Sequence, residues 1–452
     1  MDEIEGQLRA YVTAVLDRVE PVSADEVTER IPSPGRPPRR RVLVAAVALV
    51  VALLVVSTTW IVWRSSGTGV DRVTSGRGDL KGLPTDWTRI DALRDAQINA
   101  ASSSPSGVVA VGSGIWFSRD AQTWTQALDP AEVGAAAAVQ PGSVWDVTPS
   151  GRGFVAAGQA TDPGSGQAVA AIWSSPDGQR WARVRDPDLE PPTPSIPPTN
   201  SSPIRGSIDA VTRGGAGFVA VGRVFAGTFR GGTLGTAPYE PAIWTSHNGS
   251  AWKRVDVTNA VGKGPSSWKL SDVFEFDGSI FATAAVDNVT VVLESSDGDS
   301  WRRASTHTGT FARVVRHRGS LVAVGSQSPI AGSEYYERAA IWFSRDARRW
   351  KRVFLSAPAL HSHYGSVAVR GRSLVAVGIF GNQEVFVDGI MSVSNDGRAW
   401  QPVETMGTAF APNTVLSAAA AFGDRYLAFG SVTTVGENNV YMTHNEVFLS
   451  EP

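Results

Sequence analysis

Cysteine is absent from the 452-residue sequence. Its absence excludes disulfide bonds, thiolate zinc sites, iron–sulfur clusters and a cysteine nucleophile. The chain also lacks an excess of either charge, because 41 basic side chains stand against 43 acidic ones. A strongly basic domain, as expected of a nucleic-acid-binding protein, is therefore not indicated. Charged residues make up only 19% of the chain, which argues against disorder throughout.

The sequence has only one long hydrophobic run. Residues 42–63 read VLVAAVALVVALLVVSTTWIVW and carry no charge. As a helix, this run would span roughly 33 Å, enough to cross a hydrocarbon core of about 30 Å. Four arginines between positions 36 and 41 precede it, and Trp60 and Trp63 lie at its far end. Five lysines stand against 36 arginines, a composition typical of a GC-rich bacterial genome. We therefore expect a retained, single-pass signal-anchor of a bacterial cell membrane, with the N-terminus in the cytoplasm and the rest of the chain outside it.

The run is too long for the apolar core of a cleaved signal peptide, and no Ala-x-Ala site follows it. We therefore divide the chain into a cytoplasmic tail (1–41), a transmembrane helix (42–63), a linker (64–82) and a repeat domain (83–452). The tail combines an amphipathic helical pattern over residues 3–19 with a stretch rich in Pro and Arg. For this helix, docking of a partner protein and resting on the membrane both stay open.

From residue 83 onward the sequence repeats itself. Short apolar runs, most of them ending in glycine like VVAVG, recur at 108–112, 154–158, 218–222, 280–285, 321–325, 374–378 and 426–430. All but the last are followed by the pattern Ser-x-Asp/Asn-Gly/Ala-x-x-Trp. The acidic or amide position of this pattern is Asp120, Asp177, Asn248, Asp297, Asp346 or Asp396.

The pattern resembles the Asp-box, or BNR repeat, of sialidase-like and sortilin-like β-propellers. The resemblance covers most of residues 83–452 and implies an all-β fold built from four-stranded blades. Physically, Asp or Asn accepts hydrogen bonds from the backbone of its own turn, and glycine supplies a positive φ. The tryptophan then begins the returning strand and packs between neighbouring sheets. Asp120→Ala and similar changes are therefore expected to affect stability and not chemistry.

Seven blades are expected, each with strands a–b–c–d, because seven apolar runs occupy the b position. The six Asp-box units supply only six d strands, and the seventh is expected from residues 85–90, TDWTRI. The first strand would then complete the last blade and leave no free sheet edge. Six blades with an unpaired end is the alternative. The tryptophans that begin the d strands are Trp87, Trp124, Trp181, Trp252, Trp301, Trp350 and Trp400.

Recognition is expected on one face of this propeller. The a–b turns are tight and the c–d turns are Asp-boxes, so the longer segments fall on the face that carries the b–c and d–a connections. These segments are 186–205, 223–240, 326–338, 379–388 and 431–445. Candidate ligand-binding residues are Glu334, Tyr335, Tyr336, Glu337 and Arg338 in one loop, and Arg230, Tyr239 and Glu240 in another.

No catalytic residue is assigned. Tyrosine beside glutamate in the segment 333–338 suggests a sialidase nucleophile, but the arginine triad of sialidases cannot be matched, and Arg-Ile-Pro occurs only at 30–32. No metal or cofactor site is expected, although His361 and His363 are spaced to point the same way. Asp146, Asp209 and Asp272 recur on predicted innermost strands. They are expected either to bind a cation or sugar, or to hydrogen-bond neighbouring blade backbones.

The sequence therefore favours a membrane-anchored, extracytoplasmic binding or scaffold module that recognises a protein, peptide or glycan. Two alternatives stay open: a sialidase-like glycoside hydrolase, and an assembly factor like the photosystem assembly proteins that also use Asp-box propellers. Fold alone does not choose among them. Neither a cofactor nor a nucleic acid is expected as a partner.

Overall fold

The structure is a computed structural model. It describes residues 83–84, 86–134, 142–162, 166–189, 205–215, 217–225, 239–261, 268–286, 289–328, 337–355, 361–382, 385–403, 409–410, 413–435 and 441–452. The predicted amphipathic tail, transmembrane helix and linker lie outside these residues. No helix within the described part of the chain is both long and apolar enough to cross a membrane.

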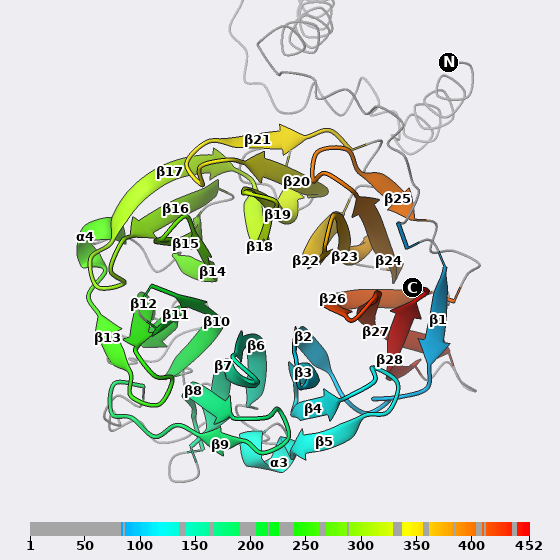
Figure 1. Cartoon of the computed structure of the whole chain (residues 1–452), viewed down its shortest axis with the longest axis horizontal. Coiled ribbons are helices and arrows are strands. Elements are labelled where there is room, and N and C mark those ends of the chain that lie inside the picture. The colour runs from blue at the N-terminus through cyan, green and yellow to red at the C-terminus, as the bar shows by residue number, and fades with distance from the viewer. Residues whose placement is uncertain are drawn as a thin grey trace, which may run out of the picture. The chain divides into compact units, whose positions relative to one another are not determined.

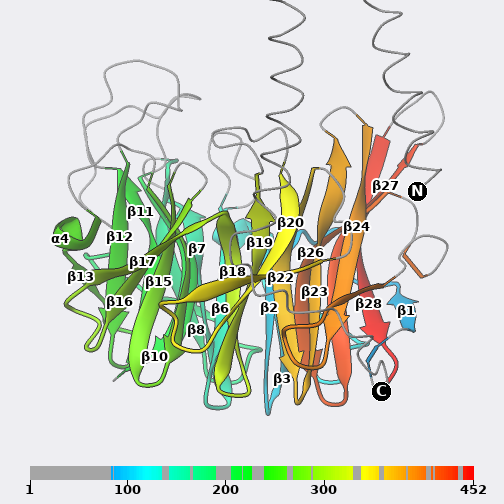
Figure 2. The ribbon, with the colours of Figure 1, turned by 90° about the horizontal axis from the view of Figure 1, so that it is seen from above.

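Seven four-stranded antiparallel sheets form a ring, with the first strand of each sheet nearest its centre (Figure 1). We call the region enclosed by these seven innermost strands the channel. The all-β, seven-bladed prediction is confirmed, and the six-bladed alternative is wrong. In each blade, strand a lines the channel and strand d lies at the rim. Seen from the side, the strands run between two faces of the ring (Figure 2). We call the face with the b–c and d–a connections the loop-rich face.

The first four blades follow the chain in order. Blade 1 comprises β2 (Ile98–Ser104), β3 (Gly107–Gly112), β4 (Ile115–Ser118) and β5 (Thr125–Leu128). Blade 2 comprises β6 (Ser143–Ser150), β7 (Gly153–Thr161), β8 (Ala168–Ser175) and β9 (Ala182–Arg183). Blade 3 comprises β10 (Gly206–Gly214), β11 (Gly217–Phe225), β12 (Tyr239–Ser246) and β13 (Lys253–Val255). Blade 4 comprises β14 (Lys269–Phe276), β15 (Ser279–Val286), β16 (Val289–Ser295) and β17 (Arg302–Thr308).

The remaining blades include the one that closes the ring. Blade 5 comprises β18 (Thr310–His317), β19 (Ser320–Gln327), β20 (Arg338–Ser344) and β21 (Trp350–Val353). Blade 6 comprises β22 (Ser362–Arg370), β23 (Ser373–Asn382), β24 (Val385–Ser394) and β25 (Gln401–Val403). Blade 7 comprises β26 (Thr414–Phe422), β27 (Arg425–Val435), β28 (Tyr441–Ser450) and β1 (Trp87–Ile90). Two short helices, α3 (Pro130–Val133) and α4 (Thr258–Val261), lie between blades in the chain.

The ring closes by pairing the two ends of the propeller. Strand β1 is antiparallel to β28, with Trp87 opposite Ser450 and Ile90 opposite Val447. The sequence prediction that residues 85–90 supply the missing d strand is therefore confirmed. An ion pair between Arg89 of β1 and the buried Glu446 of β28 joins the same two strands.

The Asp-box turns are held by hydrogen bonds that the sequence pattern predicts. Asp177 Oδ1 accepts from the backbone N–H groups of Gln179 and Arg180, at 2.9 and 3.0 Å. The other five boxes repeat this pair of bonds, including the box in which Asn248 replaces aspartate. Gly178 has a φ of +82°, and a Cβ there would lie 2.8 Å from the Phe117 ring.

The indole N–H of the Asp-box tryptophan adds a bond that the sequence analysis did not foresee. Trp181 Nε1 donates to the Gly178 carbonyl at 2.9 Å. The same bond recurs at Trp252, Trp301, Trp350 and Trp400. The tryptophan therefore ties the turn to the d strand while its ring packs in the core.

Acid is expected to weaken these turns. Backbone N–H groups, first of Thr123 for Asp120 and of Gln179 for Asp177, lower the pKa of both carboxyls to about 2. Because these pKa values are depressed from the usual 3.8, the stabilisation is present above about pH 4 and is lost as pH falls towards 2. We expect the Asp177→Asn variant to show a shallower loss of melting temperature between pH 4 and 2.

Asn248 offers the matched control for this prediction. It makes the same two backbone bonds without titrating, so Asn248→Asp is expected to steepen the acid transition. Identical pH profiles for the wild type and both variants would contradict the proposed role of the Asp-box carboxyls.

The hydrophobic core lies between adjacent blades. Between blades 4 and 5, for example, Phe281 is packed in one cluster with Phe311, Trp342 and Trp350. The Phe311 ring lies 4.6 Å from that of Trp342 and 5.0 Å from that of Trp350, measured between centroids. Trp350, which the sequence analysis assigned to a d strand, thus contributes to inter-blade packing, as expected.

Each innermost strand carries a β-bulge at the same register position, near the loop-rich face. The seven bulges fall between Ile98/Ala100, Val144/Asp146, Ile208/Ala210, Leu270/Asp272, Phe311/Arg313, Tyr364/Ser366 and Leu416/Ala418. A bulge leaves one residue unpaired and re-aims its neighbours. The bulges therefore decide which side chains meet at the channel.

Two segments expected to be loops are mostly strand. Strand β23 runs to Asn382 and β24 begins at Val385, so most of residues 379–388 is paired. Likewise, β27 extends to Val435 and β28 begins at Tyr441, which converts most of 431–445 into a long hairpin. The prediction of loops at these positions was wrong because cross-strand pairing continues past the glycine that ends the apolar repeat.

Candidate functional site

A buried ionic cluster crosses the channel. Arg313 of blade 5 donates from Nη2 to Asp146 Oδ1 of blade 2 at 2.8 Å, and from Nη1 to Oδ2 of the same carboxylate at 3.1 Å. The same Nη1 also donates to Asp272 Oδ1 of blade 4, at 3.1 Å. Asp146 and Asp272 are only 3% and 1% exposed. One guanidinium thus pairs with two buried carboxylates from different blades.

Burial governs the protonation of this cluster. It raises the pKa of the Asp272 carboxyl to about 6, although the guanidinium of Arg313 acts to lower that pKa. The neighbouring Asp146 carboxylate raises it further. The two carboxylates hold Arg313 charged, with a pKa above its usual value. This arginine is therefore already engaged by protein carboxylates.

The channel aspartates also join neighbouring blades, as one of the two sequence hypotheses predicted. Asp146 Oδ2 accepts from the Val211 N–H of blade 3 at 2.9 Å, and Asp272 Oδ2 accepts from the Val314 N–H of blade 5 at 2.6 Å. Ser366 Oγ makes the equivalent bond to the next blade. The residue after the bulge is thus an inter-blade acceptor in three blades.

The residue at the bulge itself acts as an inter-blade donor. Asn99 Nδ2 donates to the Val144 carbonyl at 2.9 Å. Ser271 and Ser417 donate in the same way to the carbonyls of Phe311 and Ile98. Each acceptor is the residue before the bulge in the following blade. In all three cases the donor needs a hydrogen on its side chain.

Asp209 occupies this donor position in blade 3 but, as a carboxylate, has no hydrogen to donate. Its Oδ1 accepts from Ser207 Oγ at 3.2 Å, and its Oδ2 is buried without a hydrogen-bond partner among the described residues. Burial raises the pKa of Asp209, while Lys269 and Arg223 act to lower it. By register, the acceptor equivalent to those in the other blades is the carbonyl of Leu270.

We expect the Asp209→Asn variant to be more stable than the wild type at pH 7, by about 1 kcal/mol. An amide can donate as Asn99 does, and it removes a buried charge. Because the folded-state pKa of Asp209 is raised, the protonated side chain stabilises the folded state below the unfolded pKa. This stabilisation is lost as pH rises through the folded pKa. The advantage of the variant in urea unfolding should therefore shrink at pH 4.

The reciprocal substitution, Asn99→Asp, tests the same idea in blade 1. It should destabilise the propeller by about 1–3 kcal/mol at pH 7, because a buried donor is lost. A stabilising effect of Asn99→Asp, or a destabilising effect of Asp209→Asn at pH 7, would contradict the donor role of the bulge residue.

The predicted ligand-binding residues fall in two different blades. Glu334, Tyr335, Tyr336 and Arg230 lie outside the described residues. Tyr239 and Glu240 begin β12 of blade 3, where Arg223 lies over the Tyr239 ring and Arg254 pairs with Glu240 at 3.7 Å. Arg338 begins β20 of blade 5. The described candidates therefore do not form one site.

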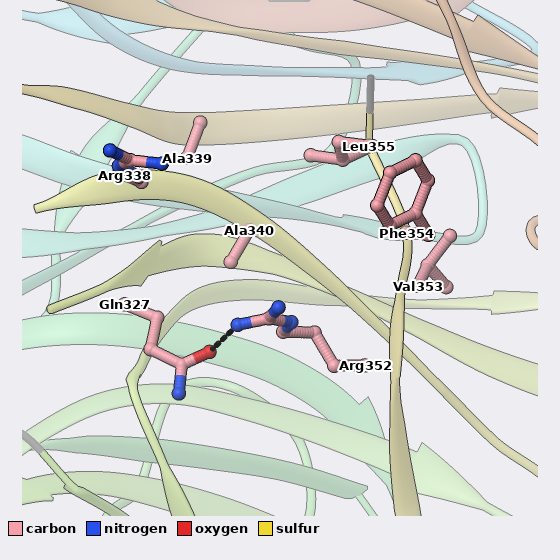
Figure 3. A pocket seen from close by; sticks show the side chains of 8 residues that line it. All are labelled: Gln327, Arg338, Ala339, Ala340, Arg352, Val353, Phe354 and Leu355. Carbon is pink, nitrogen blue, oxygen red and sulfur yellow. Dashed lines mark hydrogen bonds between the residues drawn. The ribbon is translucent and has the colours of Figure 1, made fainter. Parts of the chain in front are cut away.

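A shallow pocket of about 200 Å³ opens beside Arg338, on the loop-rich side of blade 5. Its lining residues come from the end of β19, the start of β20 and the end of β21: Gln327, Arg338, Ala339, Ala340, Arg352, Val353, Phe354 and Leu355. Gln327 Oε1 accepts from Arg352 Nη1 at 2.7 Å (Figure 3). The pocket therefore combines cationic side chains with an apolar floor.

Phe354 is the most exposed large apolar side chain in the described part of the molecule, at 62%. It follows directly on β21, while Val353 and Ala340 beneath it are buried. The strand register explains this grouping. Gln327 is opposite Arg338, and Arg352 is opposite Trp342. Because Arg338 and Trp342 are four residues apart on one strand, their side chains lie on the same face, and Arg338 and Arg352 therefore project from the same side of the sheet.

No three His, Asp or Glu side chains converge as a metal site within the described ranges. His363 lies on β22, where burial lowers the pKa of its imidazole and the nearby Glu337 raises it. Ser362, between the two histidines, is buried and accepts from the Ala339 N–H at 2.9 Å. Part of the predicted His-Ser-His pair thus joins blades 5 and 6.

Sequence reasoning missed Arg313, Arg352 and Phe354. Arg313 had a detectable signal: in the aligned segments LSDV (270–273) and FARV (311–314), it occupies the column of Asp272. A charged residue in the column that holds a buried aspartate in other innermost strands indicates a partner across the channel. Arg352 and Phe354 had none, because WKRVF (350–354) reads like any other d strand.

The sequence matches no protein-family model and finds no match among curated proteins. Solved structures with similar folds include YCF48 bound to a D1 peptide, at 12% identity and a TM-score of 0.45, covering 81% of this chain and 97% of that one. The NanB sialidase from Streptococcus pneumoniae aligns at 12% identity and a TM-score of 0.41, covering 68% of this chain and 67% of that one. The exo-β-1,3-galactanase from Clostridium thermocellum aligns at 13% identity and a TM-score of 0.35, covering 66% and 71%. The assignment of the chain as a seven-bladed β-propeller rests on its own strand pairing, and these distant likenesses say nothing of its activity.

Proposed function

We propose that this protein is a non-enzymatic binding module, held outside the cytoplasm by the apolar segment 42–63, that recognises a partner through its loop-rich face. The observation that carries the proposal is the blade 5 pocket, where the exposed Phe354 stands beside the guanidinium groups of Arg338 and Arg352. Exposed aromatic and arginine side chains are the types that contribute most to binding at protein interfaces.

The channel chemistry supports binding over catalysis. A sialidase-like hydrolase, the alternative, needs free arginines to grip a substrate carboxylate and a separate acidic group. Arg313 is instead bound by Asp146 and Asp272, and both carboxylates also accept from the backbone of a neighbouring blade. Their geometry suits a structural cross-link between blades.

The test uses the full-length chain in nanodiscs as bait in a cell-envelope extract of the source organism. A partner should be captured by the wild type, and capture should fall with Phe354→Ser, which removes the aromatic anchor. Arg152→Ala, in the exposed β6–β7 turn on the opposite face, is the matched control and should leave capture unchanged. Loss of capture with the control alone would contradict the assignment of the face.

Two further measurements test the remaining parts of the proposal. A fluorogenic sialoside assay on the same preparation should give no turnover above background, and measurable turnover would overturn the non-enzymatic function. Deletion of residues 42–63 should release the protein from the membrane fraction. Retention of the deletion variant in that fraction would overturn the anchor.

A further inference from the structure

The blade 5 pocket is rich in hydrogen-bond donors and poor in acceptors. Arg338 and Arg352 supply guanidinium donors, and neither side chain forms an ion pair with any residue that the structure describes. The one side-chain acceptor in the lining, Gln327 Oε1, is already bonded to Arg352. A ligand that satisfies this pocket must therefore bring acceptors, and negative charge is favoured.

Carboxylate acceptors fit the arginines better than neutral ones. The guanidinium group presents its donors in a planar fork that matches the two oxygens of a carboxylate.

The only acidic residue beside the pocket in the described segments of blade 5 is Glu337, and its environment includes His363 of blade 6. Its backbone carbonyl also accepts from the Ser362 N–H at 3.2 Å. Both observations associate Glu337 with blade 6.

The rest of the lining is apolar. Ala339, Ala340 and Val353 are buried at the base, Leu355 is half-buried, and Phe354 is exposed. A sugar would meet few acceptors for its hydroxyl hydrogens here. A peptide offers both components at once, since an acidic side chain can be adjacent to an apolar one.

We propose that this pocket binds an acidic peptide segment of a partner protein, with a side-chain carboxylate bound by Arg338 and Arg352 and a neighbouring apolar side chain packed on Phe354. The inference rests on the proposed function and specifies its ligand. The carboxylate contributes charge-assisted hydrogen bonds, and the apolar neighbour contributes burial against Phe354 and Leu355.

The test is selection of a displayed random dodecapeptide library on the full-length protein in nanodiscs. Enriched sequences should place Asp or Glu next to Phe, Leu or Trp. For the strongest peptide, Arg338→Gln and Arg352→Gln should each weaken binding about tenfold or more, because each removes a hydrogen bond to a charged group. Arg338→Lys, which keeps the charge and loses the fork, should fall in between. Replacing the peptide's acidic residue with its amide should reproduce the loss.

The controls distinguish failure of the acidic-peptide inference from failure of the proposed binding function. Arg338 is exposed and makes no ion pair with a described residue, so Arg338→Gln is expected to keep the wild-type melting temperature, and Arg152→Gln on the opposite face should keep wild-type binding. Enriched peptides that lack acidic residues, or that bind both glutamine variants as tightly as the wild type, would overturn the acidic-peptide inference. If such peptides still lost affinity with Phe354→Ser, the proposed function would stand. Absence of any enriched peptide would overturn the inference while the capture experiment decides the function separately.

Discussion

Replacing Arg313 with methionine is expected to destabilise the propeller by about 3–5 kcal/mol at pH 7. Methionine fills a similar volume but leaves Asp146 and Asp272 without a counter-ion in the channel. Both carboxylates are almost completely buried, so water can replace only part of the guanidinium, whose side chain is 27% exposed. Urea unfolding of the wild type and the variant measures the difference directly.

Part of the lost stability should be recovered when the two carboxylates that pair with Arg313 are replaced as well. In the triple variant with Arg313→Met, Asp146→Asn and Asp272→Asn, the amide oxygens can still accept from the Val211 and Val314 N–H groups. We expect the triple variant to recover at least half of the lost stability, since neutral polar groups need no counter-ion. Equal instability of the single and triple variants would show that the arginine acts through packing and not through charge.

The same cluster predicts the pH dependence of the Arg313→Met variant. The folded-state pKa of Asp272 is already raised to about 6, and loss of Arg313 removes the charged group that acts to lower it, beside the backbone N–H groups of Val314 and Val273. A carboxyl with a raised folded pKa contributes stability below the unfolded pKa of 3.8, and this contribution disappears as pH rises through the folded pKa. The deficit of the variant should therefore be smaller at pH 4 than at pH 7. A deficit that grows on acidification would contradict this account.

Replacing β1, Trp87–Ile90, with Gly-Ser-Gly-Ser is expected to lower the free energy of unfolding by more than about 3 kcal/mol. Trp87 packs on the buried Phe410, with ring centroids 5.8 Å apart, and so covers the core cluster between blades 6 and 7. Loss of the strand removes that packing together with the backbone pairing to β28. It also leaves the buried Glu446 without Arg89, so that the His444 ring, 2.7 Å from Glu446 Oε1, is its remaining side-chain partner in the described structure.

The opened ring should also associate. Without β1, strand β28 exposes an unpaired edge that can pair with another chain. Size-exclusion chromatography should detect dimers or larger species of the replaced chain, alongside the change in urea unfolding. Thr88→Ser, at an exposed position of the same strand, is the matched control and should be neutral. A monomeric, fully stable replacement variant would show that closure contributes little.

The strands of the propeller differ in how clearly the sequence predicts them. The closing strand was predictable, because TDWTRI (85–90) carries the same d-strand pattern as the other blades and the repeats contain one b strand more than they have Asp-boxes. Among the innermost strands, β2 had no comparable signal, since INAASSS (98–104) lacks the alternation of apolar and polar side chains that marks a strand. Its place follows only from pairing with β3.

The candidate site was less predictable than the fold. Arg338 was named from a variable loop, yet the structure places it at the start of β20, beside residues that the repeat pattern classed as ordinary d strand. Tyr239 and Glu240, named by the same reasoning, lie in blade 3 at paired strand positions. Segment length indicated the face of the propeller, but not which side chains on that face share a pocket.

The sequence by itself determined the blade type, and it favoured seven blades over six, with the ring closed by the first strand. Each Asp-box is held by hydrogen bonds between residues only two or three positions apart. A short local segment of the sequence therefore specifies it, and the same pattern recurs from blade to blade. Only the tertiary structure decided the channel cluster and the pocket. Arg313 and Asp146 are 167 positions apart, and blade packing with a bulge on each inner strand brings them within hydrogen-bonding distance. Such contacts depend on the angle between blades, which no local pattern encodes.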